Sequence, residues 1–95
     1  MATEVRDNHE RSRYELFVDS QLVGVADYDI GDGIVVFPHT EIDPPRRGQG
    51  LAALLVQHAL DGARAAGRKV VAQCWYVAEF IEQHPEYGDL VSPAR

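Results

Sequence analysis

The sequence predicts an α+β domain in which a mostly antiparallel sheet is followed by a long helix, a further strand and a short helix. Two observations predict this class. Apolar and polar residues alternate in the first half of the chain, which is typical of strands, whereas apolar residues recur every three or four positions after residue 50, which is typical of helices. A length of 95 residues fits one small domain over residues 1–95.

The first half contains three strong strand patterns and a weaker one. Alternation predicts strands at residues 14–19, 22–30 and 34–42, and a weaker strand around residues 4–9. Ser20 and Gln21 predict a short turn. The run from Gly31 to Gly33 is a hairpin signal in which two residues are free to adopt positive φ. Short connections favour antiparallel neighbours, so we predict a meander.

The second half changes to helical spacing. A long helix is predicted from Leu51 until Gly67 ends it in the left-handed conformation. Its expected apolar face comprises Leu51, Leu54, Leu55, His58, Ala59, Gly62 and Ala63. Residues 70–72 predict a buried strand, and residues 77–84 predict a second helix with Phe80 and Ile81 facing the core. The predicted order is β-β-β-β-α-β-α.

Composition excludes several classes of function. Hydrophobic residues make up 45% of the chain, which is too many for a disordered protein, and no apolar run approaches the ~20 residues of a membrane span. The net charge of −6 argues against general nucleic-acid binding, which depends on basic surfaces. The lone cysteine, Cys74, rules out an intrachain disulfide. We therefore expect a cytoplasmic protein with no nucleic-acid, membrane or metal partner, as a monomer or weak homodimer.

Residues 46–52 lie between the meander and the long helix and carry the most informative pattern. A helix N-terminus presents N–H groups without intrahelical partners and a partial positive charge, so it binds anions. Gly48 and Gly50 allow a phosphate to approach the backbone, and Arg47 adds charge-assisted hydrogen bonds. We predict that this loop holds an anionic ligand. The alternative is a plain glycine-rich turn with solvated arginines.

Two nucleotide-binding motifs do not fit this loop. A Walker loop needs a Lys-Ser/Thr pair after its last glycine, where this chain has Leu51 and Ala52. A dinucleotide fingerprint needs G-x-G-x-x-G in an early parallel βαβ unit, whereas this loop follows a meander.

The run from Arg47 to Ala52 resembles the R/Q-x-x-G-x-G/A acyl-CoA motif of the GCN5-related N-acetyltransferases. In that superfamily the motif also lies between a fourth strand and a long helix. Three segments together resemble a subgroup of minimal members of about this chain's length, and they cover nearly the whole chain from residue 12. They are residues 39–42, the glycine loop, and residues 74–78 with 84–87.

This resemblance implies a sheet that splays between the strands at 34–42 and 70–73, with the pantetheine arm of acetyl-CoA in the opening. It implies that the backbone near residues 40–42 pairs with that arm and that the pyrophosphate lies on the amides of residues 48–52. The residues expected to bind coenzyme A are Thr40, Glu41, Ile42, Arg46, Arg47, Gly48, Gln49, Gly50, Leu51 and Ala52.

The general acid departs from the family pattern. Larger members commonly place a tyrosine on the last helix to protonate the leaving thiolate, and here that position holds Ile81, while neither Tyr76 nor Tyr87 fills it. Cys74 is the replacement we consider. Its thiol would protonate the thiolate, or would itself be acetylated and pass the group on, provided that its pKa is lowered. The alternative is a small buried apolar cysteine.

An amine acceptor also needs a base, because deprotonating a lysine-like amine at pH 7 costs about 4.6 kcal/mol. His39 and Glu41 are the candidates, since both alternate to the same face of their strand. The alternative is that His39 is a polar residue on a half-exposed face. We expect structural roles for His58 and His84.

The predicted function is acetyl-CoA-dependent N-acetylation of an amine of unknown identity. Asp27, Asp29 and Asp32 could attract a cationic amine or simply be solvated charges. Two other functions stay open: a coenzyme A or acyl-CoA-binding module with little or no transferase activity, and a redox or acyl-carrier protein that works through Cys74.

Overall fold

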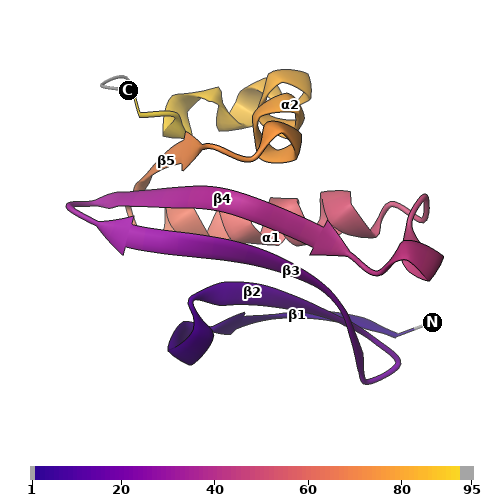
Figure 1. Ribbon diagram of the computed structural model, residues 1–95. Helices are drawn as coiled ribbons and strands as arrows, with labels where there is room; N and C mark the ends of the chain where they lie inside the picture. The colour runs from indigo at the N-terminus through magenta and orange to yellow at the C-terminus, as the bar shows by residue number, and fades with distance from the viewer. Residues whose placement is uncertain (1, 93–95) are drawn as a thin grey trace.

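The computed structural model describes residues 2–92 and has the predicted order of strands and α-helices (Figure 1). One sheet contains, in chain order, β1 (Thr3–Asn8), β2 (Arg13–Val18), β3 (Gln21–Gly31), β4 (Ile34–Ile42) and β5 (Lys69–Ala72). The first four strands pair antiparallel, and β4 pairs with β5 in parallel. The helices are α1 (Leu51–Ala65) and α2 (Trp75–Gln83). The predicted α+β class and its mostly antiparallel sheet are therefore confirmed.

Three short 3-10 helices were not predicted: η1 (His9–Arg11), η2 (Pro44–Arg46) and η3 (Pro85–Leu90). Segments this short contain too few residues for an apolar period to show in the sequence. The prediction of residues 77–84 for α2 was wrong at its start, because the helix begins two residues earlier, at Trp75.

The turns differ from prediction by single residues. Asp19 and Ser20 have φ of 49° and 70° and form the β2–β3 turn, one position before the predicted pair. At the β3–β4 turn the positive-φ residues are Asp32 and Gly33. Two consecutive positive φ values are typical of the hairpin turns that match strand twist. Aspartate is one of the few residues besides glycine that commonly adopts this conformation.

Helix α1 buries a face that is rotated from the predicted one. Its buried residues are Leu51, Leu55, Val56, Ala59, Leu60 and Ala63. His58, predicted on this face, is exposed, so its expected structural role has no support from burial. The face is rotated toward Val56 and Leu60 because α1 packs against α2 as well as the sheet.

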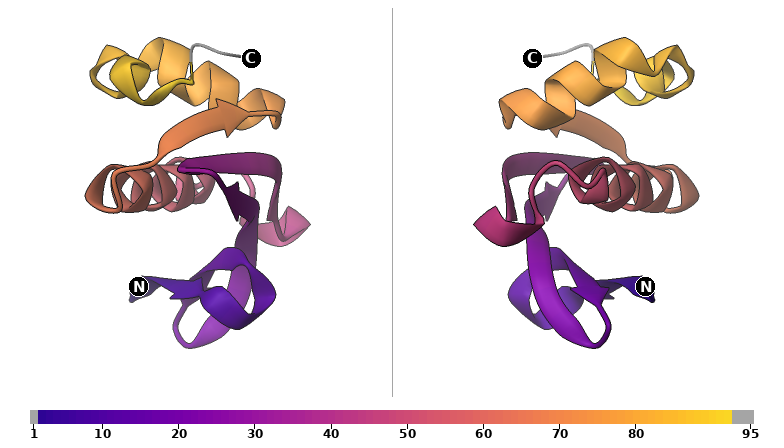
Figure 2. Two further views of the ribbon diagram at one scale, coloured as in Figure 1. Left: turned by 90° about the vertical axis from the view of Figure 1, so that its left-hand side faces the viewer. Right: turned by 90° about the vertical axis from the view of Figure 1, so that its right-hand side faces the viewer.

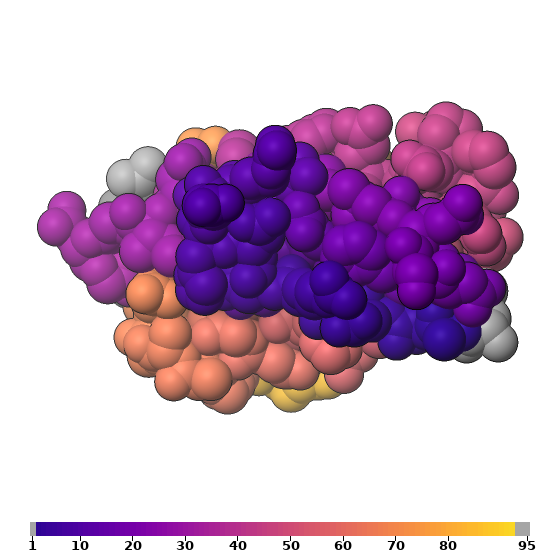
Figure 3. Space-filling view, turned by 90° about the horizontal axis from the view of Figure 1, so that it is seen from below, coloured from indigo at the N-terminus to yellow at the C-terminus, as the bar shows by residue number. Residues whose placement is uncertain are grey.

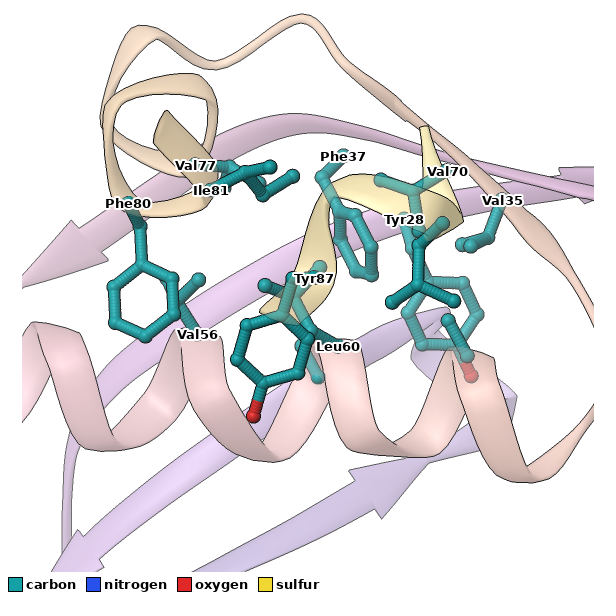
Figure 4. Packing of buried hydrophobic residues seen from close by; sticks show 13 residues of the cluster. Tyr28, Val35, Phe37, Val56, Leu60, Val70, Val77, Phe80, Ile81 and Tyr87 are labelled. Carbon is teal, nitrogen blue, oxygen red and sulfur yellow. The ribbon is translucent and has the colours of Figure 1, made fainter. Parts of the chain in front are cut away.

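The largest core cluster joins α1 to both later elements. Val56 and Leu60 of α1 lie with Val70 of β5 and with Phe80 and Ile81 of α2 (Figure 4). This confirms that Phe80 and Ile81 face the core. Burying one such side chain contributes about 1.5–3 kcal/mol, so this packing holds α2 against α1 and β5. No helix among residues 2–92 is long and apolar enough to cross a membrane.

The two faces of the sheet are covered differently. Helix α1 lies against one face, and no α-helix of the described residues lies over the opposite face of β1–β4 (Figures 1 and 2). From below, β1–β3 form the surface and α1 lies along one side of them (Figure 3). Residues that are partners in register share a face, so this pairing assigns each strand residue to the covered or the open side.

Candidate functional site

The sheet splays between β4 and β5. The parallel pairing extends only from Ile34 with Lys69 to Phe37 with Ala72. The Cys74 N–H then donates to the Phe37 carbonyl at 2.9 Å, and the chain turns away into α2. Beyond Phe37, β4 keeps its pairing with β3 alone, which leaves one edge of its last residues open.

A cleft of roughly 500 Å³ occupies this opening and joins a second hollow of roughly 230 Å³ at the loop before α1. The cleft is lined by His39, Thr40, Glu41, Ile42, Arg47, Ala52, Cys74, Trp75 and Tyr76. The hollow is lined by Ile42, Arg46, Arg47, Gly48, Gly50, Leu51, Ala52 and Tyr76. Because four residues line both, the loop and Cys74 lie on one continuous channel. Every residue expected to bind coenzyme A except Gln49 lines part of it.

The loop has the geometry of an anion cradle. Gly48 and Gly50 adopt φ of 82° and 77°, and a Cβ added to either glycine would meet no atom within 4 Å. Gly50 is the N-cap of α1, and no side chain caps the helix there. Arg47 donates from Nε to the Ile42 carbonyl at 3.2 Å, which holds its guanidinium at the junction of cleft and hollow. The N-terminus of α1, the open space beside the glycines and the positive charge of Arg47 therefore lie together, which suits an anion.

Thr40 supplies an independent indication of a ligand. Its Oγ1 is buried and has no hydrogen-bond partner among the described residues. Buried hydroxyls in folded proteins almost always have partners, and an unsatisfied one costs about 1–3 kcal/mol. Thr40 lines the cleft, so a ligand with amide groups lying along this strand edge would satisfy it.

His39 and Glu41 form a hydrogen-bonded pair at the mouth of the cleft. His39 Nε2 lies 3.1 Å from Glu41 Oε1, and the side chains are 54% and 58% exposed. The structure thus confirms that they share a face. A carboxylate that accepts from Nε2–H leaves the lone pair on Nδ1, so the ring can take a proton there.

Cys74 is half-buried in the cleft wall and is the N-cap of α2, where its side chain makes no capping hydrogen bond. Ile81, at the position of the family's tyrosine, is buried in the core, so it supplies no acid. Tyr76 does not fill the position of the family's tyrosine in the sequence, yet it lines both the cleft and the hollow. Burial, and secondarily Glu79, raises the pKa of Tyr76, which keeps its phenol protonated.

His84 has the structural role expected for it. Its Nδ1 donates to the Phe80 carbonyl at 2.8 Å, and its ring stacks on Phe80 with centroids 4.0 Å apart. Tyr87 donates to Asp61 Oδ1 at 2.7 Å, which fastens η3 to α1. These contacts hold the chain after α2 against the body of the domain.

Solved structures share this splayed fold. A GCN5-like protein from Staphylococcus aureus, determined in solution by NMR, has a TM-score of 0.72 at 18% identity, covering 97% of this chain and 90% of that chain. N-acetylglutamate synthase from Neisseria gonorrhoeae, complexed with coenzyme A and N-acetyl-glutamate, has a TM-score of 0.63 at 20% identity, covering 77% of this chain and 18% of that one. The fold is therefore that of the N-acetyltransferases.

Sequence comparison identifies the family. The family model described as GCN5-related N-acetyl-transferase matches residues 13–90. Protein NATD1 of Mus musculus is 30% identical over 96 residues, covering 94% of this chain and 86% of that protein. The chain belongs to the GCN5-related N-acetyltransferase family, as the resemblance of its loop predicted.

Proposed function

We propose that this protein transfers an acetyl group from acetyl-CoA to an amine. The observation that carries the proposal is the continuous channel from the glycine loop to Cys74. The loop end suits a pyrophosphate and the other end carries a base candidate and a thiol, which are the parts that thioester aminolysis requires.

Coenzyme A would lie along the channel with its phosphates on the loop. The amides of residues 48–52 and Arg47 would hold the pyrophosphate. The pantetheine arm would run along the open edge of β4, where Thr40 Oγ1 lacks a partner. The thioester would then reach the part of the cleft lined by His39, Glu41 and Cys74.

His39 would act as the base, with Glu41 holding its ring. The amine nitrogen loses a proton to the imidazole and attacks the thioester carbonyl, the C–S bond breaks, and the thiolate of coenzyme A takes a proton. The hydrogen bond to Glu41 orients the ring. Glu41 itself is the second candidate for the base.

Cys74 would serve the leaving group in one of two ways. Its thiol would protonate the departing thiolate, or its sulfur would attack the thioester first and then pass the acetyl group to the amine. The two routes differ in a covalent intermediate, which mass spectrometry detects as an acetyl group on Cys74 after incubation with acetyl-CoA alone.

A second candidate function is a coenzyme A or acyl-CoA-binding module with little transferase activity. Two observations favour it: Ile81 replaces the tyrosine of larger members, and no helix among the described residues covers the acceptor side of the sheet. A panel of amines tested with acetyl-CoA separates the two functions, since a module would acetylate none of them.

A pair of glycine variants tests coenzyme A binding. Gly50 and Gly67 lie near opposite ends of α1 with φ of 77° and 70°, and both have open space beyond the Cα. Gly50→Leu and Gly67→Leu therefore suffer similar backbone strain, of about 1–2 kcal/mol, but only the first puts a side chain into the hollow.

We expect coenzyme A to raise the melting temperature of the parent chain and of Gly67→Leu, because a ligand of the folded state stabilises it by mass action. Gly50→Leu should lose this shift. The absence of any shift at millimolar coenzyme A would refute the proposal, and an unchanged shift in Gly50→Leu would refute the assignment of the loop.

A further inference from the structure

The open face of the sheet carries the groups that surround the mouth of the cleft. Ala26 is buried on the covered side and is the register partner of Thr40. The flanking residues therefore project from the other face, where Asp27 is the partner of His39 and Glu41 lies two residues along. This face is the one that α1 leaves uncovered (Figure 2).

Carboxylates are concentrated next to His39 on this face. The arginines of this face pair with other carboxylates, Arg13 with Glu15 and Arg6 with Glu4, each at 2.8 Å. Asp27, Glu41 and Asp43 are the carboxylates around the mouth, and the ion pairs of Arg13 and Arg6 are with Glu15 and Glu4 and not with these three. A cation arriving at the cleft would therefore meet three carboxylates close to His39.

A shallow hollow of roughly 180 Å³ adjoins the mouth. It is lined by Leu22, Val23, Gly24, Val25, Glu41 and Asp43, and it shares Glu41 with the cleft. Leu22 is 42% exposed in its wall. Apolar lining with two carboxylates matches the alkyl stem and charged head of a lysine or arginine side chain.

The opposite rim is aromatic. Trp75 lines the cleft, is 73% exposed and meets the Tyr76 ring edge-on with centroids 5.8 Å apart. Exposed tryptophans are enriched among the residues that dominate protein interfaces, and their rings attract cations. The mouth therefore has carboxylates on one rim and an indole on the other.

We propose that the acceptor amine belongs to an extended, basic polypeptide that lies across the open faces of β3 and β4, between Trp75 and the hollow beside Leu22. This rests on the proposed acetyl transfer. Sites for small molecules bury about 70–90% of the ligand, whereas His39, Glu41 and Trp75 are more than half exposed. A free small amine would stay largely in water here, but a polypeptide gathers contacts along the whole face.

Trp75 is the single tryptophan of the chain, so its fluorescence reports on the mouth directly. The protein is saturated with coenzyme A and titrated with a short blocked peptide that has one lysine flanked by arginines. The same peptide with glutamates in place of the arginines, and a linear triamine, are titrated in parallel. We expect saturable binding of the basic peptide, weakened by salt, and much weaker binding of the other two.

A matched pair of variants tests the face itself. Asp27→Lys reverses a charge beside His39, and Glu10→Lys makes the same change in η1, on an exposed residue outside the cleft and hollow. Asp27→Lys should weaken peptide binding about tenfold, Asp27→Asn should weaken it less, and Glu10→Lys should leave it within about twofold of the parent.

Equal binding of triamine and basic peptide would overturn this inference, as would equal effects of Asp27→Lys and Glu10→Lys. Asp27→Asn keeps the test decisive if the lysine variant does not fold. The thermal shift with coenzyme A is measured on the same samples. Its loss in the parent chain refutes the proposed transferase, whereas a retained shift without peptide binding refutes only the polypeptide acceptor.

Discussion

The two ends of the channel are built on different principles. At the loop end, Gly48 and Gly50 expose backbone amides at the start of one helix, and Arg47 is anchored to the adjacent strand. At the mouth, His39 and Cys74 both line the cleft that opens because β4 and β5 separate after Phe37. The loop end is formed by the backbone of residues that are close together in the sequence. The mouth is formed by side chains of residues that are far apart in the sequence. Binding should therefore depend on the first end and turnover on the second.

Cys74→Ser should produce the largest effect of the three substitutions. The effect should be on turnover at the mouth and not on coenzyme A binding. A hydroxyl is a far weaker acid and nucleophile than a thiol, so we expect kcat to fall by about 10²–10⁴-fold. Serine is favoured at a helix N-cap, and Cys74 is the N-cap of α2 without a capping bond, so the variant should be at least as stable as the parent. Calorimetry should show unchanged coenzyme A affinity. Full activity in Cys74→Ser would remove Cys74 from the mechanism.

Arg47→Ala should affect the loop end alone. Removing a charge-assisted hydrogen bond to phosphate costs about 1.5 kcal/mol or more, which is a loss of coenzyme A affinity of about tenfold. Arg11→Ala removes the same charge from the exposed η1 and serves as the control. Calorimetry checks both. An equal loss in the two variants would mean that general charge, not the cradle, attracts the ligand.

Tyr87→Phe should have the smallest effect and leave both ends of the channel intact. It removes the hydrogen bond to Asp61, so we expect about 1 kcal/mol less stability at neutral pH. Burial, and next the bond to Asp61, raises the pKa of Tyr87 from 10.0 to about 12.

The sign of the pH effect follows from that raised pKa. The folded state holds the Tyr87 proton more tightly, so its stabilisation is complete below pH 10 and is lost as pH rises toward about 12. Thermal melts of parent and Tyr87→Phe between these limits should converge as pH rises. Parallel curves would contradict the assigned pKa shift.

The sequence could predict the features that depend on local pattern. The strands, the glycine loop and the shared face of His39 and Glu41 all follow from spacing within one segment. The start of α2 could not be predicted in the same way. It depends on where Val77 and Phe80 pack against α1, and starting at Trp75 instead of residue 77 places Tyr76 in the wall of the channel.

The surroundings of the mouth could not be predicted from the sequence either. The hollow beside Leu22 needs the register between β3 and β4, and the exposure of Trp75 needs the turn that follows β5. For Gln49 the sequence predicted too much, because this residue lies within the motif yet does not line the channel. Motif spacing identifies a segment but not which of its side chains reach the ligand.

The most direct test of the central claim is an amide-resolved NMR titration of the ¹⁵N-labelled protein with coenzyme A. We expect the largest shifts at the amides of residues 48–52, further shifts at residues 40–42 and at Cys74, and none at η1 or at the β3–β4 turn. Shifts confined to other surfaces, or none at millimolar coenzyme A, would contradict the assignment of the channel as the acetyl-CoA site.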